Sequence, residues 1–181
     1  MISTNFIKGT GLKKIPNRGS SKLKLPSERK DFIAAMRTLW RDEEAEYKGK
    51  YSEFTPVRCY PKPKAPNGPP VLVGGIGSPY VYRRVAEWGD GWIPLIADMA
   101  AFEEGMEKLN IACEGVGRDM ATVDVTIFGM SGQWRRGDEI RQLEKGGANR
   151  VVIWINAQDS EGAIREMEAL AIVKASVSPE S

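Results

Sequence analysis

The segment best suited to chemistry is a glycine-rich loop made of Gly74, Gly75, Ile76, Gly77 and Ser78. It lies between an apolar run and a helical pattern, so it predicts a strand-to-helix connection. Glycines let backbone N–H groups approach a phosphate, and the N-terminus of the following helix favours negative charge. Ser78 would add a hydroxyl donor. The loop is therefore a candidate phosphate site; the alternative is a tight turn that needs glycine only for positive φ.

A Rossmann dinucleotide site is a rival interpretation of the same loop. Its fingerprint is G-x-G-x-x-G, with the glycines at fixed spacing after a strand. Here Gly75 and Gly77 are followed by Tyr80 where the third glycine belongs. The next expected strand also begins only about a dozen residues further on, which is short for that unit. The spacing therefore disfavours a dinucleotide site.

The sequence contains no histidine. Triads, general bases and zinc sites that depend on histidine are thereby excluded for this chain. Proton chemistry would have to come from carboxylates, lysine, tyrosine, a cofactor or groups outside the chain, so the catalytic residues are unknown at this stage. No metal site is expected either, because the acidic residues Glu43, Glu44 and Glu46 lack partner ligands and predict exposed charge.

Composition indicates an ordinary soluble protein. The chain has 181 residues, 41% of them hydrophobic and 28% charged, with a net charge of +2. Neither nucleic-acid binding nor a membrane surface follows from that balance, and no run reaches the roughly 18 apolar residues of a membrane span. Cys59 and Cys113 lie far apart without a CxxC spacing, so free thiols and a cytoplasmic location are expected.

The chain divides by composition into three parts. Residues 1–26 form a basic, loop-rich leader without acidic residues. A nucleic-acid arm is the alternative interpretation of this leader, but it has no aromatic residue beyond Phe6. Residues 27–173 carry the regular patterns of the main domain, and residues 174–181 form a tail.

The patterns after residue 26 predict an α/β protein. A helix should begin with Ser27 as its cap, followed by a hairpin that turns at Lys48 and Gly49 and by a proline-rich connector at 56–70. Four strands are then expected at 71–73, 92–95, 123–128 and 151–155, each followed by a helix. The last of them is apolar on both faces, as a buried parallel strand would be. An open sheet can use four strands, whereas a (β/α)8 barrel needs eight.

Several segments in order resemble the luciferase-like monooxygenase family. They share similar spacing with it and lie at 35–40, 47–51, 61–63, 69–75, 83–92 and 147–154. The resemblance implies the C-terminal half of a TIM (β/α)8 barrel, with about four β/α units and the first half missing. It also places the glycine loop at the mouth of the barrel, near the flavin phosphate.

The resemblance carries further expectations about function. It implies an oxidoreductase or monooxygenase that uses FMN or a deazaflavin (coenzyme F-420) and a small-molecule substrate, in truncated form. Gly9, Thr10 and Gly11 are similar to a strand-end loop that contacts the cofactor in deazaflavin-dependent relatives. A homodimer, or a partner that supplies the missing N-terminal half, is expected because four β/α units leave two sheet edges unpaired. The alternative is a catalytically inactive fold remnant or assembly partner.

Overall fold

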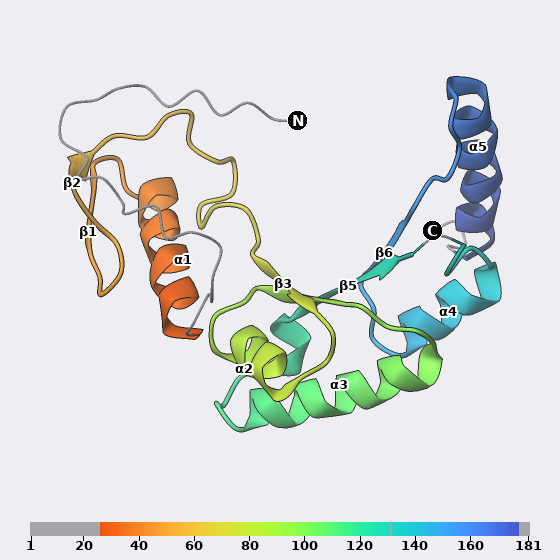
Figure 1. Ribbon diagram of the computed structural model, residues 1–181, viewed down its shortest axis with the longest axis horizontal. Helices are drawn as coiled ribbons and strands as arrows, with labels where there is room; N and C mark the ends of the chain where they lie inside the picture. Colours follow the sequence, from red (N-terminus) through yellow and green to blue (C-terminus); the bar gives the residue numbers. More distant parts are fainter. Residues whose placement is uncertain (1–25, 131, 178–181) are drawn as a thin grey trace. The chain divides into compact units, whose positions relative to one another are not determined.

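The computed structural model describes residues 26–130 and 132–177, which belong to two compact units, 1–69 and 70–181 (Figure 1). In the first unit, helix α1 (Pro26–Arg41) precedes the strands β1 (Ala45–Lys48) and β2 (Glu53–Val57). The predicted leader at 1–26 lies outside the described residues apart from Pro26. Proline suits the first helical position because it has no N–H to leave unpaired there.

Ser27 does not precede the first helix. The helix begins at Pro26, so Ser27 lies within its first turn, and the prediction that Ser27 caps the helix start is wrong. The predicted hairpin is confirmed, but its turn covers 49–52, because Lys48 still belongs to β1 and pairs with Glu53. The strands β1 and β2 are antiparallel, with Tyr47 opposite Phe54 and their rings stacked at 6.0 Å. Such cross-strand aromatic pairs stabilise short hairpins.

A single carboxylate from α1 holds the hairpin turn. Asp31 accepts hydrogen bonds from the Ser52 hydroxyl at 2.7 Å and from the Tyr47 hydroxyl at 3.1 Å. It also accepts from the backbone N–H groups of Lys50, Tyr51 and Ser52 at 3.0, 3.0 and 2.8 Å. Burial raises the pKa of Asp31, but these hydrogen bonds, with that of the Ser52 hydroxyl the largest, bring its pKa below the usual value.

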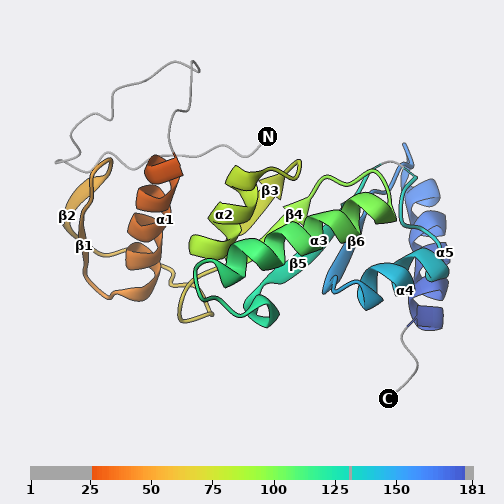
Figure 2. The ribbon, with the colours of Figure 1, turned by 90° about the horizontal axis from the view of Figure 1, so that it is seen from below.

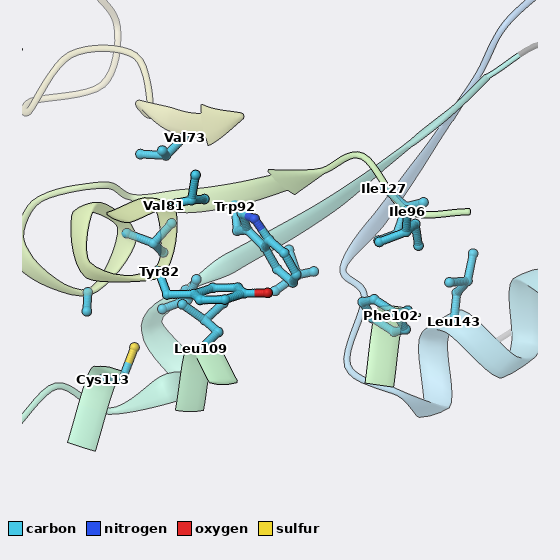
Figure 3. Close-up of a cluster of buried hydrophobic side chains, with 14 of the residues drawn as sticks. Val73, Val81, Tyr82, Trp92, Ile96, Phe102, Leu109, Cys113, Ile127 and Leu143 are labelled. Atoms are coloured by element: carbon cyan, nitrogen blue, oxygen red, sulfur yellow. The ribbon is translucent and has the colours of Figure 1, made fainter. Parts of the chain in front are cut away.

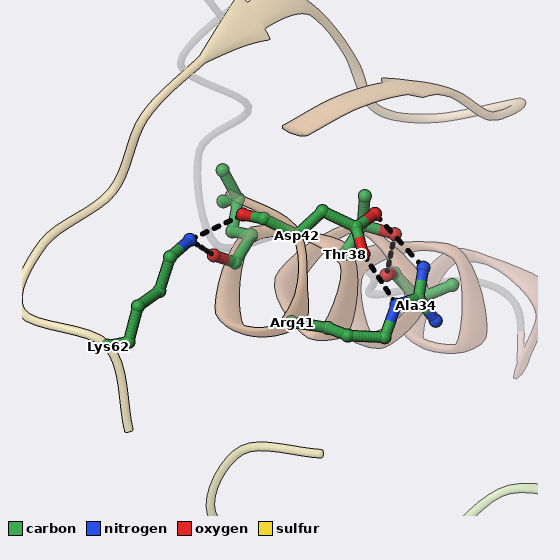
Figure 4. A network of polar contacts seen from close by, with 6 residues as sticks. Ala34, Thr38, Arg41, Asp42 and Lys62 are labelled. Carbon is green, nitrogen blue, oxygen red and sulfur yellow. Dashed lines mark hydrogen bonds and ion pairs between the residues drawn. The ribbon is translucent and has the colours of Figure 1, made fainter. Parts of the chain in front are cut away.

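The proline-rich connector also returns to α1 (Figure 4). The Lys62 ammonium donates hydrogen bonds to the carbonyl oxygens of Leu39 at 2.8 Å and Asp42 at 2.5 Å. These carbonyls belong to the C-terminal end of the helix, where unpaired acceptors and the helix dipole favour a cation. Further along the connector Gly68, at a φ of +81°, lies against the Trp40 ring, where a Cβ would approach within 2.1 Å.

The second unit alternates strands and helices as the sequence predicts. Its strands form one parallel sheet in the order β3-β4-β5-β6, which confirms the α/β class. The elements are β3 (Leu72–Gly75), α2 (Pro79–Glu87), β4 (Gly91–Pro94), α3 (Met99–Glu114), the 3-10 turn η1 (Met120–Thr122), β5 (Asp124–Gly129), α4 (Gly137–Lys145), β6 (Arg150–Ile153) and α5 (Ser160–Val177).

The strand order distinguishes two kinds of α/β sheet. In a doubly wound sheet the order reverses once, so helices cover both faces. Here each strand lies beside the one before it, and right-handed crossovers then place successive helices on the same face. Figures 1 and 2 show α2, α3 and α4 on one side of the sheet. This arrangement is the one found in a sector of a (β/α)8 barrel, and four strands are half of the eight that a barrel needs.

The core of this unit lies between the sheet and those helices (Figure 3). Trp92 of β4 is 1% exposed and meets the Tyr82 ring of α2 edge-on at 5.5 Å between centroids. From α3 come Phe102, Leu109 and Cys113, all fully buried, because their spacing places them on one face of the helix. Gly105 of the same helix lies over the Trp92 indole, so the glycine lets the helix approach this large ring closely.

The edge of the sheet departs from the prediction of a strand buried on both faces. In β6 the burial alternates between exposed and half-buried positions, and Val152 is 38% exposed. The reason is that helices cover only one face and that, within the described chain, β6 pairs with β5 alone. The following helix, α5, has no buried residue, although its apolar spacing predicts a core-facing stripe.

Both cysteines lie among the described residues. Cys59 is exposed and Cys113 is buried, and both are free, as their separation in the sequence predicts. Burial raises the pKa of the Cys113 thiol, which keeps it protonated and inert. Within residues 26–130 and 132–177, no helix is long and apolar enough to cross a bilayer.

Replacing Asp31 with Asn should loosen the hairpin turn by about 1–2 kcal/mol, since hydrogen bonds to a charged acceptor are lost. Amide hydrogen exchange at Lys50, Tyr51 and Ser52 measures the effect. Because folding lowers the Asp31 pKa, the wild-type stabilisation should be complete above about pH 4 and disappear as the pH falls through the lowered value. Lys30→Gln on the same helix is the control. Equal protection in both variants would show that Asp31 does not hold the turn.

Adding a methyl group at Gly105 should destabilise the second unit. A Cβ there would lie 2.5 Å from Trp92 Cη2, so Gly105→Ala should cost about 1–3 kcal/mol by overpacking. Gly115→Ala, where the nearest atom is 3.5 Å away, is the control and should be neutral or stabilising by up to about 1 kcal/mol. Urea unfolding followed by tryptophan fluorescence measures both. A neutral Gly105→Ala would contradict the close approach of α3 to Trp92.

Candidate functional site

The glycine loop lies where a phosphate site of this fold would have to be. It follows the carboxyl end of β3 and leads into α2, so the predicted strand-to-helix connection is confirmed. Ser78 is the N-cap of α2, and its hydroxyl accepts a hydrogen bond of 3.4 Å from the Val81 N–H. Ile76, in the middle of the loop, is 74% exposed. The loop thus presents its backbone and the helix N-terminus at the carboxyl edge of the sheet.

The three glycines of this loop have different structural roles. Gly75 has a φ of +145°, a conformation that side-chain-bearing residues rarely adopt. Gly77 lies against the Tyr82 hydroxyl, where a Cβ would approach within 2.2 Å. Gly74 has neither restriction, since the nearest atom to a Cβ there would be the Ile93 carbonyl oxygen at 3.8 Å. A tight turn therefore explains Gly75 and Gly77, whereas Gly74 keeps open space beside the backbone.

A row of exposed apolar side chains extends from the loop along the sheet. The residue directly after each strand is large, apolar and at least 48% exposed. We call this set the carboxyl rim: Ile76, Leu95, Met130 and Trp154, which are 74%, 48%, 52% and 53% exposed. Carboxyl ends of parallel strands form the binding face of both barrels and open α/β sheets. The carboxyl rim is therefore the candidate wall for an apolar ligand group.

Polar side chains tie the connections behind the carboxyl rim to one another. Gln133, in the loop after β5, accepts a hydrogen bond from the Met130 N–H at 3.0 Å and donates one to the Ala97 carbonyl at 3.2 Å. Arg135 forms an ion pair with Glu166 of α5 at 2.5 Å and donates to the Trp154 carbonyl. The loops after β4, β5 and β6 are thereby held in register with one another.

Glu166 is the charged centre of this arrangement. Besides Arg135, its carboxylate accepts the N–H groups of Asn156 and Ala157 at 3.0 and 3.1 Å. Desolvation raises the pKa of Glu166, but the Arg135 guanidinium and the two amides lower it more, so its pKa lies below the usual value. The carboxylate is ionised and both of its oxygens have partners. It is therefore a positioning group for the rim and is unsuited to act as a general base.

The opposite edge of the sheet has a purely structural role. Asp90 accepts a hydrogen bond from the Val71 N–H at 2.7 Å, and its own N–H donates to the Val71 carbonyl at 2.8 Å. Asn149 does the same with Val125, at 2.8 Å in both directions. These residues fasten the amino ends of neighbouring strands. The turn at 90–92 therefore lies at the amino edge of the sheet, opposite the glycine loop.

No further side chain that the sequence singled out near the loop joins this site among the described residues. Arg83, which follows the loop by one helical turn, is paired with Glu87 at 2.6 Å and is 71% exposed, so it is a solvated helix-face residue. Gly9, Thr10 and Gly11 lie outside the described residues, and their role stays a prediction. The part of the chain that the structure describes contains no group of three or more cysteine and acidic side chains that could hold a metal ion.

Sequence reasoning missed part of this site. Leu95 and Met130 were not predicted as site residues, because the predicted strands at 92–95 and 123–128 end at other residues than β4 and β5, and only the structure places both directly after a strand. The Trp134 backbone was not predictable: it has a φ of +57°, and its ring is 6% exposed with an indole N–H that has no protein partner. The Trp134 ring packs beside Gly129, where an added Cβ would lie 3.2 Å from the ring.

Comparison with known proteins identifies the family. The sequence profile of the luciferase-like monooxygenase family matches residues 9–139, and the chain belongs to that family. Uncharacterized proteins of Mycobacterium bovis and Mycobacterium tuberculosis are 37% identical to it over 90 residues. That alignment covers 50% of this chain and 31% of each relative, so the match spans about a third of their length.

Two solved structures are similar over most of this chain and about half of their own. The monooxygenase RslO1 from Streptomyces bottropensis has 23% identity and a TM-score of 0.44, with 81% of this chain and 42% of that one covered. An F-420-dependent secondary alcohol dehydrogenase, solved with an F-420-acetone adduct, has 17% identity and a TM-score of 0.47. There the match covers 88% of this chain and 57% of the other.

The close contact between Gly77 and Tyr82 can be tested by a double-mutant cycle. Gly77→Ala should cost about 1–3 kcal/mol, because the new methyl group meets the phenol oxygen. In a Tyr82→Phe background the next atom, Cζ, is 3.2 Å from that methyl, so much of the cost should vanish. Thermal unfolding of the four proteins should give a coupling of at least about 0.5 kcal/mol. Additive effects would show that the loop has another conformation.

Proposed function

We propose that this chain is the carboxyl-terminal half of a flavin- or deazaflavin-dependent luciferase-like oxidoreductase or monooxygenase and that residues 74–78 bind the cofactor phosphate. The observation that carries the proposal is that a chain of this family has its glycine loop at the position where a phosphate would bind. The chain belongs to a family that uses FMN or F-420. Its glycine loop stands at the carboxyl edge of a consecutively ordered parallel sheet, directly before a helix N-terminus. A phosphate there would meet N–H groups and the positive end of the helix dipole.

The residues at the loop fit such a group. Gly74 leaves free space for an approaching oxygen, since the nearest atom to a Cβ there would be 3.8 Å away. The Ser78 hydroxyl, held at the helix N-cap, can donate its hydrogen because its own bond to Val81 uses only an acceptor lone pair. Neither residue would have to move far. These two positions are therefore the ones whose replacement tests phosphate binding without distorting the turn.

The carboxyl rim would orient the rest of the ligand. When bound, a reduced flavin or deazaflavin supplies hydride or oxygen chemistry. The rim would pack Leu95, Met130 and Trp154 against an apolar ring and exclude water from it. Arg135 and Glu166 hold these side chains in place through the loops. No proton transfer is assigned to any residue of this chain.

A catalytically inactive remnant of the fold is the second candidate. The observation that favours it is the chemistry of the rim, whose four residues carry no ionisable group, in a chain without histidine. The family supports FMN or a deazaflavin as the cofactor and a small molecule as the substrate. The free thiols support a cytoplasmic location.

Fluorescence titration of the purified chain with FMN and with F-420 tests the proposal. One of them should bind. Gly74→Ala, whose methyl group would block the approach of the phosphate, and Ser78→Ala, which removes a hydroxyl donor, should each raise its Kd about tenfold or more. Riboflavin, which lacks the phosphate, should bind the variants and the wild type equally. Ser78→Ala should also lower stability by about 1 kcal/mol, because it removes the N-cap.

Ser176→Ala, on the exposed side of α5, is the matched control and should leave every Kd unchanged. If neither cofactor binds the folded protein at up to about 100 µM, cofactor binding is rejected for this chain and the remnant is favoured. If FMN and riboflavin respond alike to the two substitutions, the ligand binds without a phosphate contact at this loop.

A further inference from the structure

Tyr82 of α2 brings a hydroxyl group from the core to the glycine loop (Figure 3). Its ring is part of the buried core and meets the Trp92 ring edge-on, and the residue is 6% exposed. Its oxygen lies against Gly77, where a Cβ would approach within 2.2 Å of it. A side chain that is more than nine-tenths buried therefore ends at the loop that is the candidate phosphate site.

The Tyr82 hydroxyl has no hydrogen-bond partner among the described residues. Burial raises the pKa of Tyr82, and two charged groups of α3 act on it in opposite directions, since Lys108 lowers the pKa and Glu104 raises it. Those two groups form an ion pair with each other, and neither is bonded to the phenol. Tyr82 therefore carries a neutral hydroxyl whose hydrogen is free to be donated.

Packing alone does not explain a hydroxyl at this position. Phenylalanine would fill the same space beside Trp92 without taking a polar group out of water, a transfer that costs free energy when no hydrogen bond replaces the water. The Tyr82 oxygen is not among the unpaired polar atoms that are completely enclosed, so a small group can reach it. The hydroxyl is therefore suited to a partner that is not part of the described chain.

The loop supplies further donors next to this hydroxyl. The backbone N–H groups of Gly77 and Ser78 have no hydrogen-bond partner in the part of the chain that the structure describes. Ser78 is also the N-cap of α2, a helix of nine residues whose dipole is positive at this end. Several donors without an acceptor, at the positive end of a helix, match an anion, whereas a cation would be repelled there.

We propose that the Tyr82 hydroxyl donates a hydrogen bond to the phosphate of the cofactor, in addition to the contacts of the loop itself. This inference rests on the proposed function, because it assigns one more donor to the same site. The core holds the Tyr82 ring, so the hydroxyl needs little ordering when the ligand binds, and a preorganised donor adds more to affinity than a mobile one. The core of the second unit thus takes part in binding the ligand.

Tyr82→Phe tests this role, because it removes the hydroxyl and keeps the ring. Fluorescence titration of the full chain with FMN and with F-420 should show that the Kd of the cofactor that binds rises about tenfold, as expected for a lost hydrogen bond to a charged group. The Kd of riboflavin, or for F-420 that of the deazaflavin chromophore without its phosphate, should stay unchanged. Thermal unfolding of the ligand-free variant should occur at or above the wild-type midpoint, because no hydrogen bond within the protein is lost.

Tyr80→Phe is the matched control. It makes the same change in the same helix at a position that is 67% exposed, and it should leave the Kd values and the unfolding midpoint unchanged. A second measurement does not depend on a variant. In the wild-type protein, the chemical shift of the Tyr82 ring carbon that bears the oxygen should move when the phosphate-bearing cofactor is added and stay in place with the phosphate-free compound.

The possible failures are distinguishable. If Tyr82→Phe binds the cofactor as the wild type does while Ser78→Ala weakens binding, the loop holds the phosphate without Tyr82, and only this inference is rejected. If Tyr82→Phe unfolds at a lower temperature and binds cofactor and phosphate-free compound equally weakly, the hydroxyl serves packing. If neither cofactor binds the folded wild-type chain, the proposed function fails and the role of Tyr82 fails with it.

Discussion

Parallel strands that are neighbours in sequence order impose one constraint on the second unit: every connection must cross the sheet on the same side. The helices then bury one face and leave the other without a layer of its own. All carboxyl ends meet at one edge, which brings the glycine loop and the carboxyl rim together. All amino ends meet at the other edge, where Asp90 and Asn149 fasten them. The division between the edge with the candidate site and the edge with structural contacts therefore follows from strand order.

Glycines let the backbone approach large aromatic rings closely, and these contacts set how near the helices lie to the sheet. Trp92 is buried under α3 only because Gly105 has no side chain there, and Tyr82 reaches the glycine loop because Gly77 has none. These contacts couple the core to the glycine loop, since Tyr82 of α2 touches both the Trp92 ring and Gly77. Gly75 and Gly77 thus serve the turn and its packing, and Gly74 alone has no such restriction.

In the first unit, by contrast, polar contacts fix the hairpin turn and the connector. Asp31 organises the hairpin turn, and Lys62 fastens the connector to the end of α1. Both residues act through backbone groups that would otherwise need water. In the second unit Glu166 has the same function for the loops behind the rim. Burying a carboxylate among N–H donors costs desolvation, and the lowered pKa values of Asp31 and Glu166 show that the donors more than compensate.

The sequence by itself determined the local elements, because hydrophobic periodicity and glycine positions act over short distances. It predicted the hairpin, the four β/α units and the family. Only the tertiary structure decided the strand order, the exposure of Val152 and of α5, and the alignment of Leu95 and Met130 with Trp154. Those properties depend on which strands become neighbours, and a periodic pattern is the same whether its second face meets protein or solvent. The missed cap at Ser27 has the same origin: the pattern marks a helix but leaves its first residue to the chain around it.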